Sequence, residues 1–98
     1  MTGARTIIFM VQVVFTANLK RHVDCPPVHV AGNTVAEALD KVFNDNPTLR
    51  RYVLDDQGAL RKNMVVFVDG RALEDRRTLT DSLGDDSELF VMQALTGG

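Results

Sequence analysis

Two glycines, Gly97 and Gly98, end the sequence and place an α-carboxylate on a stretch without side chains. Because glycine has no Cβ, such a stretch can adopt φ > 0 and enter narrow clefts that exclude bulkier residues. A free α-carboxyl has a pKa of about 3.5, so at neutral pH it is an anion and a poor electrophile. The carboxylate of Gly98 must therefore be activated before a nucleophile can react with it.

The residues before the glycines favour a functional end over the alternative, a frayed terminus without a role. An apolar run at 88–94 predicts a strand directly before the tail, so the tail would leave a rigid element. We therefore expect a globular domain over 1–93 and a flexible, extended C-terminal tail over 94–98. A tail of that length extends at most about 17 Å from the domain.

Other residues suited to catalysis are scarce. Cys25 is the single cysteine, and His22 and His29 are close to it only in sequence. A small buried or half-buried thiol is a better interpretation of Cys25 than a catalytic nucleophile. No nucleophile–base pair or metal-ligand cluster is evident, so we predict no catalytic residue, no metal site and no enzyme activity of its own.

Length and charge exclude several classes of protein. A chain of 98 residues with a net charge of −2 is one domain without the clustered basic surface that nucleic acid requires. The pairs Arg50-Arg51 and Arg76-Arg77 are interpreted as solvated, with contacts to an acidic partner as the weaker alternative. No apolar stretch approaches the roughly 20 residues that span a bilayer, and 7–15 lacks a signal-peptide pattern. We expect a cytoplasmic protein that binds neither nucleic acid nor membrane.

Runs of β-branched and aromatic residues predict the strands that must hold the tail. These runs lie at 7–15, 28–31, 64–68 and 88–94, and 71–80 is expected to contain a short edge strand and irregular structure.

One long helix is predicted after the second strand. Thr34 suits its N-cap, and Glu37 completes a capping-box pattern. Pro47 ends the helix, and 49–54 is expected to form a short second helix or a turn. The spacing i, i+4, i+7 and i+8 predicts one buried helical face, made of Val35, Leu39, Val42 and Phe43.

The predicted order β-β-α-β-(short β)-β indicates the α+β class. One mixed sheet of four to five strands, with one main helix packed across it, is the economical way to bury the helical face. This is the order of the β-grasp, or ubiquitin-like, fold. In that fold the first and last strands lie side by side in the middle of the sheet, a topology taken from the fold and not from periodicity.

Several motifs resemble those of the MoaD/ThiS family of sulfur-carrier proteins over most of the chain. The matching segments are the first strand and its exit (11–20), the helix start (34–39), the Pro-x-Leu after the helix (46–49), the strand and turn Val-Phe-Val-Asp-Gly (66–70), the turn at 83–89, and Gly97-Gly98. The sequence departs from the family at Gln93, where many relatives have proline, and in the Asp85-Asp86-Ser87 turn, which lacks the usual glycine. Neither departure touches the diglycine end.

The resemblance implies that Gly98 is the modified residue. In this family an E1-like enzyme adenylates the carboxylate with ATP, and a sulfide or persulfide donor displaces AMP to leave a thiocarboxylate. The thiocarboxylate gives its sulfur to a small molecule in an acceptor synthase, of which the chain can be the small subunit. Leu95, Thr96 and Gly97 would thread into the partner's site. ATP is used by the activating enzyme, and no cofactor is bound by the chain.

The family register also implies a docking face. It turns Val66, Val68, Leu89 and Val91 toward the helix, and alternate residues of a strand face opposite sides. An exposed cluster of large apolar side chains commonly marks an interface, although the 71–80 segment could cover part of it. The residues predicted on the outer face are Val65, Phe67, Phe90 and Met92.

Two other functions remain open at this stage. A ubiquitin-like modifier joined through Gly98 to target lysines needs the same tail and the same adenylation, although the motif order favours a sulfur carrier. A β-grasp adaptor without carboxyl chemistry is disfavoured by the diglycine end. The acceptor pathway also stays open among molybdopterin, thiamin, cysteine and specialised sulfur-containing metabolites. The extra segment 49–62 makes the chain nearer in length to the molybdopterin and cysteine types.

Overall fold

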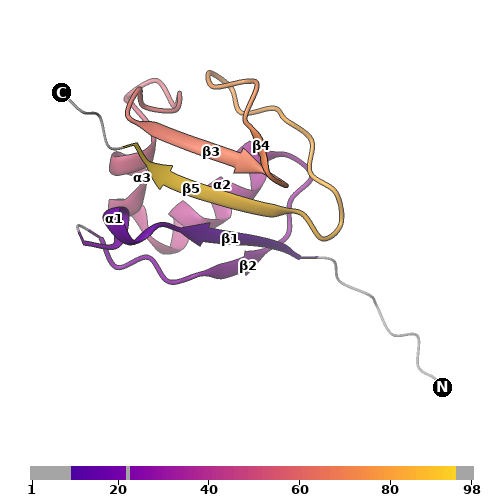
Figure 1. The fold of residues 1–98 in the computed structure, drawn as a ribbon, viewed down its shortest axis with the longest axis horizontal. Helices are drawn as coiled ribbons and strands as arrows, with labels where there is room; N and C mark the ends of the chain where they lie inside the picture. The colour runs from indigo at the N-terminus through magenta and orange to yellow at the C-terminus, as the bar shows by residue number, and fades with distance from the viewer. Residues whose placement is uncertain (1–9, 22, 95–98) are drawn as a thin grey trace.

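A five-stranded mixed sheet organises the computed structural model, which describes residues 10–21 and 23–94. Its elements are β1 (Val11–Phe15), α1 (Ala17–Lys20), β2 (Val28–Val30), α2 (Val35–Asp45), α3 (Pro47–Val53), β3 (Met64–Val68), β4 (Arg71–Ala72) and β5 (Glu88–Gln93) (Figure 1). The strand order is β2-β1-β5-β3-β4, with β1 and β5 parallel at the centre and the other pairs antiparallel. The predicted mixed β-grasp sheet, with the first and last strands adjacent, is confirmed.

The long helix α2 begins where the sequence predicts. The Thr34 hydroxyl accepts the backbone N–H of Glu37 at 3.2 Å, and the Glu37 carboxylate accepts the backbone N–H of Asn33 at 2.8 Å. The second bond reaches one residue before the N-cap, so it satisfies a different donor from the one in an ideal capping box. The predicted face is buried together with one further residue, and the buried set is Val35, Ala38, Leu39, Val42 and Phe43.

The two shorter helices differ from the prediction. Pro47 ends α2 and is also the first residue of α3, a position where its missing N–H costs nothing. The segment expected at 49–54 is thus a helix that starts two residues earlier. The turn α1 was not predicted, since its four residues are too few to show helical periodicity. Of the first predicted strand, β1 begins at Val11, and 7–9 lie outside the described residues.

Alternation along the three central strands builds the core between the sheet and the helices. The inward residues are almost completely buried, while Val68, predicted to face inward, is half-buried and packs against the same core. The inward set on the central strands is Val11, Val13, Phe15, Met64, Val66, Leu89 and Val91. β5 is therefore held by strands on both sides and by the core beneath it.

The turn between β3 and β4 is fixed to the start of β5. Asp69 and Gly70 have φ angles of 50° and 84°, as a two-residue type I′ hairpin turn requires. The Asp69 carboxylate accepts the hydroxyl of Ser87 at 2.8 Å and the backbone N–H of Glu88 at 2.9 Å. These two hydrogen bonds hold the pKa of Asp69 below its ordinary value. The bond from Glu88 has the larger effect and the bond from Ser87 the smaller. These bonds set where β5 begins.

Candidate functional site

The end of β5 is the point from which the predicted tail continues. Gln93 pairs with Met64 of β3, and the backbone N–H of Ala94 donates to the carbonyl of Asn63 at 2.7 Å. Hydrogen bonding to the rest of the domain thus continues one residue beyond β5, and Ala94 is half-buried. Leu95, Thr96, Gly97 and Gly98 lie outside the described residues. Their roles and the boundary of the tail stay predictions.

A turn at 61–64 presents the carbonyl that holds Ala94. The backbone N–H of Met64 donates to the carbonyl of Arg61 at 3.0 Å and closes the turn. Arg76 donates from one guanidinium nitrogen to the carbonyls of both Arg61 and Met64, each at 2.8 Å. The prediction that Arg76 is simply solvated is therefore wrong, because its guanidinium is half-buried against a distant turn. Its neighbour Arg77 is exposed, as predicted.

The outer face of the sheet carries a continuous apolar patch. Phe90 lies beside Val14 of β1 on one side and beside Phe67 of β3 on the other. Phe67 in turn pairs with Ala72 of β4. Phe90 is 37% exposed, and Val65 lies opposite Met92 in the next pair. The outer apolar face therefore consists of Val14, Val65, Phe67, Ala72, Phe90 and Met92.

All four residues predicted for this face lie on it, whereas Val14 and Ala72 were missed. Alternation within β1 could have indicated that Val14 points away from the core. Its place beside Phe90, however, depends on the parallel pairing of β1 with β5. A shallow hollow of about 250 Å³ lies on this face, lined by Phe67, Gly70, Glu88 and Phe90.

The segment after β4 turns toward the helix side of the sheet. The carbonyls of Leu79 and Asp81 accept the backbone N–H groups of Ala36 and Val35, at the start of α2. Leu73 and Leu79 are buried in the core. These contacts favour an outer face that the 71–80 segment leaves open.

Solved structures provide the comparison with known proteins, since no protein-family model and no curated protein matches the chain. Small archaeal modifier protein 1 from Haloferax volcanii matches with a TM-score of 0.76 and 25% identity, over 91% of this chain and 99% of that chain. A chain of the Amycolatopsis orientalis BexX/CysO complex matches with a TM-score of 0.75 and 22% identity, over 90% of this chain and 99% of that chain. CysO from Mycobacterium tuberculosis matches with a TM-score of 0.73 and 16% identity, over 87% of this chain and 99% of that chain.

The structural neighbours of this chain are ubiquitin-like proteins of the MoaD/ThiS type. The resemblance inferred from the sequence motifs is thereby confirmed, as is the β-grasp fold. These neighbours are small sulfur carrier or modifier proteins and not catalytic enzymes.

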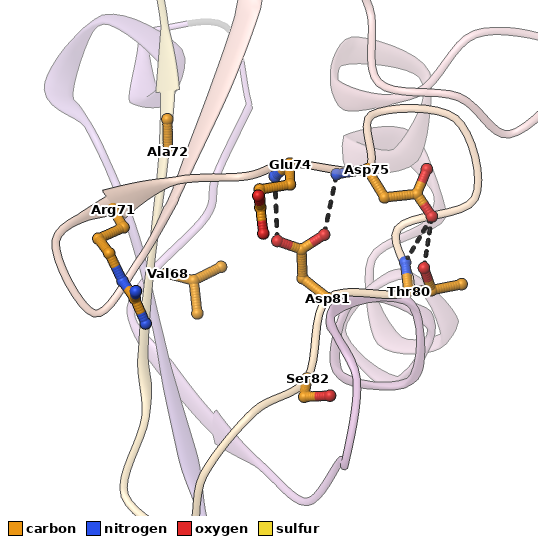
Figure 2. Close-up of a pocket in the computed structure, with 8 residues that line it drawn as sticks. All are labelled: Val68, Arg71, Ala72, Glu74, Asp75, Thr80, Asp81 and Ser82. Atoms are coloured by element: carbon orange, nitrogen blue, oxygen red, sulfur yellow. Dashed lines mark hydrogen bonds between the residues drawn. The ribbon is translucent and has the colours of Figure 1, made fainter.

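A polar groove of about 950 Å³ lies between the β3–β4 hairpin and the 74–82 loop of this ubiquitin-like protein (Figure 2). Asp81 accepts the backbone N–H groups of Glu74 and Asp75. The Asp75 carboxylate accepts hydrogen bonds from the hydroxyls and the backbone N–H groups of Thr78 and Thr80. These bonds, and the two hydroxyl bonds most of all, lower the pKa of Asp75 well below its usual range. Both carboxylates hold the loop's own backbone, so loop structure accounts for the groove.

Cys25 is placed as a structural residue. Its side chain is 2% exposed, and burial is the main reason why the pKa of the thiol is raised. A raised pKa leaves less of the reactive thiolate at neutral pH. Cys25 and the exposed His29 line a cavity of about 470 Å³ beside β2, and His22 lies outside the described residues.

Residues 10–21 and 23–94 contain neither a candidate metal site nor a candidate membrane-spanning helix. No group of three or more His, Cys, Asp and Glu side chains there is arranged to hold a metal ion. In the same part of the chain, none of the helices has the length and apolar character needed to cross a membrane.

Proposed function

We propose that this ubiquitin-like protein is a sulfur carrier whose Gly98 carboxylate is adenylated by an E1-like enzyme and then converted to a thiocarboxylate. The observation that carries the proposal is the structural match to small archaeal modifier protein 1 and CysO over nearly the whole chain. It is supported by the position of Gly97 and Gly98, which follow β5 in the sequence.

The proposed chemistry needs partners for every step. A carboxylate oxygen of Gly98 attacks the α-phosphorus of ATP, and pyrophosphate leaves. A hydrosulfide ion then attacks the acyl carbon, AMP leaves, and a thiocarboxylate remains. A persulfide donor would instead give an acyl disulfide, which a thiol must reduce. The chain contributes the carboxylate and its presentation, and the activating enzyme uses the ATP. We expect the reaction to take place in the cytoplasm.

The outer apolar face is the proposed docking surface for the activating enzyme and the acceptor synthase. It includes Phe90 and Met92 of β5, so a partner that receives the tail also approaches this face. Apolar patches on a monomer's surface commonly mark interfaces. One neighbouring structure is itself a complex, that of BexX with CysO. The acceptor pathway, whether molybdopterin, thiamin, cysteine or a specialised metabolite, is set by the synthase that docks.

A ubiquitin-like modifier is the second candidate function. It is favoured by the neighbours named small archaeal modifier protein 1, from Haloferax volcanii and Methanosarcina acetivorans. The same acyl-adenylate would be used, but the amine of a target lysine would finally take the Gly98 acyl group as an amide. The two functions therefore differ only in the nucleophile that accepts the activated carboxyl.

Intact-protein mass spectrometry separates these functions. The full chain is incubated with ATP, sulfide and candidate E1-like enzymes. Sulfur carriage predicts replacement of one oxygen by sulfur, confined to the C-terminal peptide. Conjugates on lysines of added protein would promote the modifier function, and no adduct with any activating enzyme would contradict both.

The matched control is a variant that lacks Gly97 and Gly98. It should not be activated, yet its thermal unfolding should match that of the full chain, because terminal residues bury little surface. A large loss of thermal stability would show instead that the two glycines are structural.

A further inference from the structure

We propose that Arg76 is a positioning residue, whose guanidinium holds the 61–64 turn and through it fixes Ala94, where the C-terminal tail begins. The structural part of this inference stands on described contacts alone. Its consequence for activation rests on the proposed function.

The first step is the pair of hydrogen bonds from Arg76 to the turn. Its Nη2 lies 2.8 Å from the carbonyl oxygens of both Arg61 and Met64, the residues at the two ends of the turn. Hydrogen bonds from a charged donor are stronger than neutral ones, and the planar guanidinium holds a defined direction. One side chain thus fixes the distance between the ends of the turn.

The second step is the link from the turn to the tail. Asn63 lies inside the turn, and its carbonyl accepts the backbone N–H of Ala94 at 2.7 Å. The preceding residue, Gln93, pairs with Met64, whose carbonyl Arg76 holds. The position of Ala94 therefore depends on the shape of a turn that the Arg76 side chain stabilises.

The turn has other supports, which make the role of Arg76 testable without unfolding the protein. Arg61 donates from Nε to the carbonyl of Arg51 at 2.7 Å and from its backbone to that of Val53 at 3.0 Å, both in α3. The Arg76 backbone carbonyl also accepts the N–H of Leu60 at 2.8 Å. A change of the Arg76 side chain leaves these bonds in place, so only the end of the sheet should loosen.

The short reach of the tail gives this anchor its importance. The four residues 95–98 extend at most about 14 Å beyond Ala94. A misplacement of about 1 Å at a reacting group can lower a rate on the order of 100-fold. An anchor that drifts would therefore misplace the Gly98 carboxylate in an activating enzyme, even when the outer apolar face is docked correctly.

Amide hydrogen exchange measured by NMR tests the structural link. In Arg76→Gln the Ala94 amide should exchange faster by on the order of tenfold, the effect of losing a charge-assisted hydrogen bond. Arg76→Lys, which keeps a charged donor, should give a smaller change. The matched control is Arg77→Gln, which removes the same charge from the adjacent exposed residue and should leave Ala94 unchanged. Equal Ala94 exchange in Arg76→Gln and wild type would overturn the proposal, as would equal acceleration at Ala38 in α2.

Activation kinetics test the consequence. With the E1-like enzyme, Arg76→Gln should lower kcat about tenfold and leave KM for the carrier unchanged, since the docking face is intact. Faster Ala94 exchange with an unchanged kcat would overturn the positioning role. If the wild-type chain is never activated, the proposed sulfur-carrier function fails, while the exchange measurement still decides whether Arg76 fixes Ala94.

Discussion

Leu89 and Phe90 are neighbours in β5 and lie on opposite faces of the same sheet. Leu89 is completely buried beneath the strands, whereas Phe90 is 37% exposed between Val14 and Phe67. Both are large apolar residues, so their burial follows from the pleat of the strand and not from their hydrophobicity. The inner face stabilises the domain, and the outer face keeps apolar surface available for a partner.

The largest expected effect is the contrast between two aspartate variants at these adjacent positions. Leu89→Asp places an unpaired carboxylate in the core and should destabilise the domain by several kcal/mol, enough to prevent folding of a marginally stable chain. Phe90→Asp should melt cooperatively close to the wild-type temperature. Circular dichroism melts of the two variants measure the difference. Equal melts would show that the two faces are not distinct, and a reversed order would place the strand register off by one residue.

The helix gives a second test of the inner face. Leu39→Ala removes a side chain that is 1% exposed and should lower the free energy of unfolding by about 2–5 kcal/mol. Asp40→Ala, at the next and exposed position of α2, is the control and should change it by less than about 0.5 kcal/mol. Denaturant titrations measure both, and a small effect at Leu39 would contradict tight packing of α2 on the sheet.

The outer face is tested by binding. Phe90→Asp should weaken the complex with the activating enzyme at least about tenfold, as expected for a large anchor at the centre of an interface. Tyr52→Asp is the control, because Tyr52 is also 37% exposed but lies on α3, away from this face. Calorimetric titration compares the two variants. Undiminished affinity in a folded Phe90→Asp variant would remove Phe90 from the interface.

The smallest expected effect concerns the turn that anchors the start of β5. The pKa of Asp69 is lower in the folded chain, so its contribution is present above its unfolded pKa of about 4 and is lost as the pH falls through the folded value. Asp69 is exposed, so solvent screening limits this contribution to less than about 1 kcal/mol. Asn tolerates the positive φ at this position, so Asp69→Asn removes the charge and one of the two acceptor oxygens without straining the turn.

Urea titrations at several pH values give the difference in stability between the wild-type chain and Asp69→Asn. That difference should shrink as the pH is lowered from 7 to about 2. A difference that is independent of pH would show that the Asp69 charge contributes nothing to folding.

Local patterns were enough to predict the main helix and strands, whereas the adjacency of the first and last strands was taken from the β-grasp fold. The N-cap at Thr34 and the buried face of α2 follow from residues within a few positions of one another, and these were predicted correctly. The turn at Asp69 and Gly70 follows from the same kind of short-range signal. The single turn α1 was missed because four residues carry no readable period.

The candidate site was predictable only in part. The family register indicated which residues face the helix, and alternation, a local property of a strand, then placed Val65, Phe67, Phe90 and Met92 on the other face. Val14 joins them only because β1 lies parallel to β5, a pairing between strands far apart in the sequence.

The sequence by itself determined that Gly97 and Gly98 follow an apolar strand, and that adjacent residues of this strand face opposite sides. Only the tertiary structure decided how the strand ends. The Arg76 guanidinium reaches carbonyls 15 and 12 positions away, and the turn that it holds accepts the Ala94 N–H. Backbone carbonyls are present at every residue, so sequence cannot show which of them a side chain will find. That choice is made when the chain folds and brings distant loops together.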